Sequence, residues 1–183
     1  MRRLVVLLSV TGALATAPLA AQDSTPAPKP ADSTHADSTQ PPPPPTADQQ
    51  KWMQGLRTAA RGIGQIKSGI ENVQRAGTSA AQLKRAGKLL AGFCGTGRGF
   101  MRAGVAKMPS AAYEGDNRKI AKQVVIQIDS VARETNTCEV QAARDPKTSV
   151  EHLMPFIQSY EAAIAAWRSM VGLPPLPTRT TKP

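Results

Sequence analysis

The sequence predicts an all-α protein, an antiparallel up-down four-helix bundle with one intrachain disulfide between its second and third helices. Two observations lead to this prediction. Apolar residues recur at alternating steps of four and three in four successive segments, which is the pattern of a helix that buries one face. Cys94 and Cys138 both fall on these apolar seams, in adjacent segments. Four helices with short connections pack most simply as an antiparallel bundle.

The first predicted helix begins near Trp52, and its apolar seam is unbroken until Gly77, which is a typical helix stop. The seam consists of Trp52, Leu56, Ala59, Ile63, Ile66, Ile70 and Val73.

The second predicted helix has Thr78 or Ser79 as its N-cap and contains the unusual stretch GFCGTGRGF, residues 92–100. Its seam consists of Leu83, Gly87, Leu90, Cys94, Gly97 and Met101. The stretch lacks the spacing of a dinucleotide or Walker motif, and no Lys-Ser/Thr pair follows it. We therefore expect a helix here rather than a phosphate-binding loop.

The third and fourth helices follow the same pattern. Their seams are Ala121, Val124, Ile128, Val131, Thr135 and Cys138, and then Ile157, Tyr160, Ile164, Trp167 and Val171. Thr148 and Glu151 have the spacing of a capping box, and Pro155 is expected to bend the fourth helix. The up-down topology places Trp52 and Trp167 at the same end of the bundle, where we expect them to plug the core.

A bond between the two cysteines restricts the connection between the second and third helices. In an antiparallel helix pair with equal rise, the residue numbers of any two residues at the same level along the axis have a constant sum. Cys94 and Cys138 give a sum of 232, so the turn should centre near Asp116, within the turn-forming residues 115–117. Pro109 would then kink or break the second helix. If that helix instead ends at Lys107, the cysteine levels differ by about eight residues, or roughly 12 Å, and a break among the glycines is needed.

The ends of the chain differ in composition from the middle. Residues 1–21 have the two arginines, short apolar run and small residues of a cleaved signal peptide, and residues 22–46 form a proline-rich spacer that we expect to be disordered. Residues 47–172 make the bundle domain, and residues 173–183 a disordered tail. Export to the periplasm or the outside of the cell would supply the oxidising environment for a disulfide.

A ladder of small residues follows the second helix at four-residue steps: Gly87, Ala91, Gly95, Gly99 and Ala103. Such a ridge permits close approach of another helix, either within one chain or between two chains in self-association. The alternative is a frayed or broken helix that the disulfide holds together.

No catalytic or metal-binding set stands out. The only histidines are His35, in the spacer, and His152. Met53 and His152 are the best pair for a haem, but they lie at opposite ends of an up-down bundle. We therefore predict a protein that is not an enzyme and has no metal or other cofactor.

Positive charge is concentrated in the first helical hairpin. Residues 51–107 hold eleven basic residues and one acid, a net charge of +10, whereas residues 108–183 have a net charge of +1. The charges avoid the apolar seam and should lie on the outer surface. The candidate contacts for an anionic partner are Arg57, Arg61, Lys84, Arg85, Lys88, Arg98 and Arg102.

The leading functional hypothesis is an exported, non-enzymatic helical module whose basic hairpin contacts an anionic envelope lipid or glycan, or an acidic protein surface. Nucleic acid is a less favoured partner, because no aromatic residues interleave with the charges. Two alternatives stay open: a surface whose charge serves solubility alone, and a carrier of a small molecule or cofactor with a pocket where the glycines thin the core beside Cys94.

Overall fold

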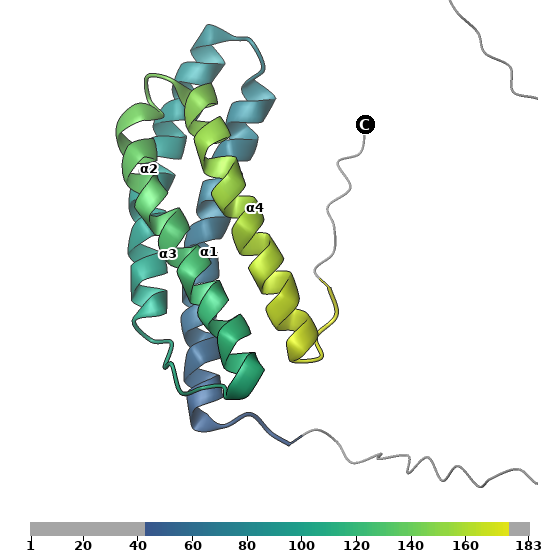
Figure 1. Cartoon of the computed structure of the whole chain (residues 1–183). Helices are drawn as coiled ribbons and strands as arrows, with labels where there is room; N and C mark the ends of the chain where they lie inside the picture. The colour runs from purple at the N-terminus through teal and green to yellow at the C-terminus, as the bar shows by residue number, and fades with distance from the viewer. Residues whose placement is uncertain (1–42, 176–183) are drawn as a thin grey trace, which may run out of the picture. The chain divides into compact units, whose positions relative to one another are not determined.

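The computed structural model describes residues 43–175 and shows four helices with no strand in that range. These helices are α1 (Ala47–Ala76), α2 (Ala80–Val105), α3 (Gly115–Gln141) and α4 (Pro146–Met170). Consecutive helices run antiparallel (Figure 1), so the predicted fold is confirmed. The predicted signal peptide, the spacer as far as residue 42, and the tail after residue 175 lie outside the described residues.

Local signals explain where α1 begins and ends. Thr46 caps its N-terminus in a capping box, in which its hydroxyl accepts a hydrogen bond from the Gln49 N–H at 3.2 Å and its own N–H donates to the Gln49 side chain at 3.0 Å. Gly77 ends the helix with φ at 56°, a conformation that glycine adopts without strain. The predicted stop is thus confirmed.

Helix α2 includes the whole of GFCGTGRGF, which confirms the helical interpretation of that stretch. Ser79 occupies the N-cap position, one of the two predicted residues, although its side chain makes no capping hydrogen bond. The helix is continuous through its glycines, so the alternative of a helix broken there is wrong.

The start of α4 differs from the sequence prediction. Asp145 caps this helix by accepting a hydrogen bond from the Thr148 N–H at 3.2 Å, and Pro146 follows as the first helical residue. Hydrogen bonding by Thr148 also lowers the pKa of Asp145. The predicted capping box of Thr148 and Glu151 is therefore wrong, because the chain uses an Asp-Pro start instead. The helix continues through Pro155.

The connection between α2 and α3 also corrects the sequence analysis. Helix α2 ends at Val105, before Pro109, and α3 begins at Gly115. Cys94 lies 11 residues before the end of α2 and Cys138 lies 23 residues after the start of α3, a difference of about 18 Å at helical rise. Residues 106–114 run along the bundle axis and cover this offset (Figure 1), so neither a continuous α2 nor a break among the glycines is needed.

The disulfide joins the two hairpins of the bundle across its core. The Cα atoms of Cys94 and Cys138 are 6.1 Å apart, and both residues are buried. The predicted pairing is confirmed. Lys67 on α1 and Glu161 on α4 form an ion pair that links the first helix to the last.

Aromatic residues close one end of the core. The rings of Trp52 and Trp167 have centroids 5.0 Å apart, and Tyr113 packs edge-on against Trp52 at 5.3 Å. The indole N–H of Trp167 donates a hydrogen bond to the Tyr113 hydroxyl at 3.3 Å. Both tryptophans are buried, so the predicted plug at this end is confirmed and includes a tyrosine from the connection before α3.

Close packing of α1 against α2 depends on glycines that differ from the predicted ladder. A methyl group on Gly104 would lie 2.6 Å from the Gly55 carbonyl oxygen, and one on Gly97 would lie 2.9 Å from the Gly62 carbonyl oxygen. A methyl group on Gly69 would lie 2.8 Å from the Leu90 side chain on α2. The contact therefore follows seven-residue steps on both helices.

The predicted ladder does not form one contact ridge within the chain. Gly87 meets the Ala142 carbonyl group after α3, Gly95 faces the Glu139 carboxylate, and Gly99 has no atom within 4 Å of the position of a methyl group. The prediction of close helix packing along all these residues inside one chain is wrong, because the ladder winds from the α3 side of α2 to its outer side. Self-association of two chains through this ladder stays a prediction.

Replacing the two outward glycines of α2 should stabilise the protein. Gly92 and Gly99 are exposed, and a methyl group on either would meet no atom within 4 Å. Alanine restricts the unfolded chain and favours the helix by up to about 1 kcal/mol per site. We expect Gly92→Ala/Gly99→Ala to raise the free energy of unfolding in urea by about 1 to 2 kcal/mol. A decrease would show that these glycines have a structural role in α2.

Candidate functional site

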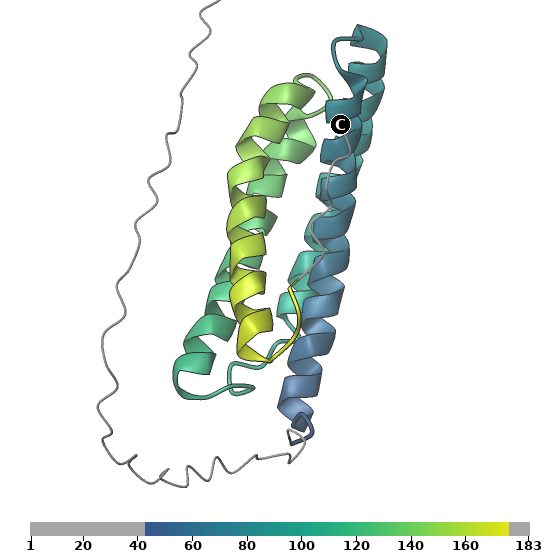
Figure 2. The same cartoon turned by 90° about the vertical axis from the view of Figure 1, so that its right-hand side faces the viewer.

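Exposed positive charges gather at the end of the bundle where α1 meets α2. The turn between α1 and α2 extends past the turn between α3 and α4 in both views (Figures 1 and 2). The exposed cations near it are Arg75 at the end of α1, and Lys84, Arg85 and Lys88 in the first turns of α2.

The glycine contacts fix the register of the hairpin and hence the levels of its charges. Each contacting pair has numbers that sum to 159, as in Gly62 and Gly97. Three pairs of basic residues share this sum and therefore lie at common levels along the hairpin: Arg57 with Arg102, Arg61 with Arg98, and Arg75 with Lys84. Like charges thus recur at matched heights on the two helices.

Two hollows flank the first turns of α2, and basic side chains line both. One has a volume of about 400 Å³ and is lined by Arg75 and Arg85 together with Asn72 and Leu89. Arg75 is held there by a hydrogen bond to the Asn72 side chain at 2.7 Å.

The other hollow has a volume of about 380 Å³ and lies between α2 and the start of α4. Its charged lining residues are Lys84, Arg144, Lys147 and Asp145, and the last of these caps α4. Arg144 and Lys147 belong to a half of the chain whose charge is balanced in sequence. Only the fold brings them beside Lys84, so sequence reasoning missed them.

Two of the predicted contact residues are engaged within the bundle. Arg98 is largely buried, with its side chain 21% exposed, and it pairs with Glu139 and hydrogen bonds to Asn136 on α3. Arg61 lies over the Phe100 ring, with its guanidinium carbon 5.8 Å from the ring centroid. Arg98 therefore has a clear structural role in joining α2 to α3.

The remaining predicted contacts are free on the surface. Arg57, Lys84, Arg85, Lys88 and Arg102 are exposed, and within residues 43–175 none of them has a carboxylate within ion-pair distance. Their positive field is therefore not neutralised by close ion pairs in that part of the chain.

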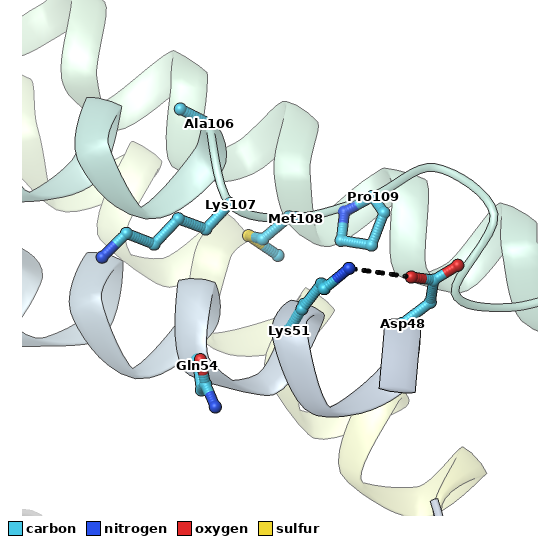
Figure 3. Close-up of a pocket in the computed structure, with 7 residues that line it drawn as sticks. All are labelled: Asp48, Lys51, Gln54, Ala106, Lys107, Met108 and Pro109. Carbon is cyan, nitrogen blue, oxygen red and sulfur yellow. Dashed lines mark ion pairs between the residues drawn. The ribbon is translucent and has the colours of Figure 1, made fainter. Parts of the chain in front are cut away.

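A third hollow, of about 360 Å³, lies at the opposite end of the hairpin. Figure 3 shows Lys51 and Lys107 on either side of the Met108 side chain, with Lys51 turned toward Asp48 at 3.7 Å. The charged side chains of this lining sum to +1, whereas those of each of the other two linings sum to +2, so the end near Arg75 and Lys84 is the better candidate for binding an anion.

The positions of the candidate haem ligands agree with the topology. Met53 lies near the start of α1 and His152 near the start of α4, at opposite ends of the bundle. Across residues 43–175, no three His, Cys, Asp or Glu side chains gather closely enough to hold a metal ion. The carrier hypothesis expects a pocket beside Cys94, where glycines thin the core. The space in front of Gly97, three residues after Cys94, is filled by the Ile66 side chain and the Gly62 carbonyl group.

Two further findings bear on the kind of protein this is. In the described part of the chain, no helix has the length and apolar character required to cross a membrane. No protein family matches the sequence, and no curated protein or solved structure is significantly similar to it. The residues of the site are therefore the basis for assigning a function.

Proposed function

We propose that this protein is an exported, non-enzymatic binding module that attaches to an anionic partner through the basic end of its α1–α2 hairpin. The observation that carries the proposal is the group of cations around the first turns of α2. They come from four segments of the chain: Arg75 from α1, Lys84 and Arg85 from α2, Arg144 from the α3–α4 connection, and Lys147 from the start of α4. A surface of this kind attracts negative charge more strongly than the same residues would if they were dispersed.

The shape of the hairpin supports this proposal. The α1–α2 turn extends past the neighbouring turn (Figure 2), so a large partner can reach it from the end of the bundle. The preferred partners are an anionic envelope lipid or glycan, or an acidic protein surface. Nucleic acid is less favoured, because no aromatic side chain is among those that line the two hollows.

The proposed location follows from the disulfide and from the N-terminal sequence. A buried bond between Cys94 and Cys138 is typical of proteins that mature in an oxidising compartment. Together with the signal-peptide pattern of residues 1–21, it supports a periplasmic or secreted protein.

Reversing the charge at this end of the bundle should strongly weaken binding. The test variant replaces Lys84, Arg85, Arg144 and Lys147 with Glu. The purified, oxidised protein is titrated with polyphosphate and with vesicles that contain phosphatidylglycerol, over a salt series. We expect wild-type binding to weaken steeply between about 50 and 200 mM salt, and the variant to bind at least about tenfold more weakly at low salt.

A matched control separates a local site from a general effect of charge. Replacing Lys51, Lys107, Lys119 and Arg133 with Glu makes the same change in net charge away from the two hollows. We expect this control to retain most of its affinity. Equal loss in the two variants would contradict a site at the α2 start, and the absence of wild-type binding at low salt would leave solubility as the role of the charge.

A further inference from the structure

We propose that the hollow beneath the connection between α2 and α3 binds a small amphipathic carboxylate, such as a medium-chain fatty acid. This site is separate from the basic end of the hairpin and does not depend on the function proposed for it. The hollow has a volume of about 340 Å³. That volume is at the lower end of the range for small-molecule pockets, so it suits a ligand with a short apolar body.

The axial course of residues 106–114 creates this hollow. Because the connection runs along the bundle and does not turn back at once, it leaves a space between itself, the start of α1 and the first turns of α3. The apolar residues that line the space are Trp52, Met108, Pro109, Tyr113, Ala121 and Val125. Such a lining favours an aliphatic or aromatic body over a fully polar ligand.

The charged groups at the hollow are all positive. Arg118 and Lys122 lie one helical turn apart on α3, and Ser110 is the remaining polar lining residue. In residues 43–175 neither cation has a carboxylate within ion-pair distance, although Lys119 between them pairs with Asp116 at 2.8 Å. Two unpaired cations beside an apolar space are complementary to one carboxylate at the end of an apolar chain.

The aromatic cluster supplies a direct readout of binding. Trp52 lines the hollow and packs on Trp167, with ring centroids 5.0 Å apart, and the chain has no other tryptophan. A ligand that enters the hollow should therefore change the tryptophan emission of the folded protein.

The test titrates the oxidised protein with decanoate below its micelle concentration and follows tryptophan emission. Decanol and decyltrimethylammonium serve as the uncharged and cationic comparisons. We expect saturable binding of decanoate, weaker binding of decanol and the weakest binding of the cation. No saturable change with decanoate, or equal binding of the cation, would overturn the proposal.

Variants then locate the site. Arg118→Gln/Lys122→Gln should weaken decanoate binding by about tenfold and leave decanol binding unchanged, because only the carboxylate loses its partners. Val125→Phe should reduce the binding of both ligands by filling the space. Two exposed control variants, Lys119→Gln/Arg133→Gln and the hairpin variant with Lys84, Arg85, Arg144 and Lys147 replaced by Glu, should bind decanoate like the wild type.

Equal weakening in those controls would contradict a local site. Far-ultraviolet circular dichroism and urea unfolding check that each variant is folded. If Val125→Phe is destabilised, Ser110→Phe tests the same space from the connection, and unchanged decanoate binding in a folded Ser110→Phe protein would count against the proposed pocket.

Discussion

Removing the disulfide by the double substitution Cys94→Ala/Cys138→Ala should lower the free energy of unfolding by about 4 kcal/mol. The bond joins residues 44 positions apart, so it restricts a long loop of the unfolded chain. Both cysteines are buried in the core, and the lost sulfur atoms also remove packing contacts there. A loss of this size is a large fraction of the stability of a typical domain.

Urea unfolding of oxidised wild type, reduced wild type and the double variant measures this effect. We expect reduction to destabilise the wild type about as much as the substitutions do, and to leave the double variant unchanged. The dependence of the unfolding free energy on urea should also become steeper without the bond, because the unfolded chain exposes more surface. A difference of less than about 1 kcal/mol would show that the bundle is held in place without its covalent link.

The substitution Gly62→Ala/Gly104→Ala should separate α1 from α2 and lower the free energy of unfolding by about 3 kcal/mol. The new methyl groups would overlap backbone atoms of the facing helix, such as the Gly97 and Gly55 carbonyl groups. A side chain can change rotamer to avoid such an overlap, but the backbone of a helix cannot. The helices must therefore move apart, and contacts weaken along the hairpin.

The outward pair Gly92→Ala/Gly99→Ala is the matched control, since it also replaces two helical glycines with alanine, at positions where the methyl group meets no atom within 4 Å. Both double variants gain the helix propensity of two alanines, so the difference in their unfolding free energies isolates the effect of close packing. Similar stability of the two variants would contradict the role of the inward glycines.

The sequence was most informative where one helix can be analysed alone. The apolar seams predicted all four helices, and Gly77 marked the end of α1. The start of α4 was misplaced, although the Asp145 and Pro146 pair was a usable signal for a cap followed by a first helical residue. The contacting glycines were also detectable in principle, because they repeat every seven residues on both helices.

The relations between helices were harder to predict. A constant number sum locates the turn between α2 and α3 only if that turn is tight, whereas residues 106–114 extend along the axis and shift the register. This shift brings Arg144 and Lys147 beside Lys84. Charge counts along the chain could find the basic hairpin but could not add these two residues, because their proximity exists only in the folded bundle.

The same arrangement has a consequence for cleavage of the chain. Residues 106–114 are the only peptide connection between the α1–α2 and α3–α4 hairpins, and the bond from Cys94 to Cys138 is a second covalent connection between them. A protease that cuts after Lys107 would therefore leave two fragments that remain one covalent molecule until the disulfide is reduced. The protein can be nicked in the segment that lines the apolar hollow without losing either half.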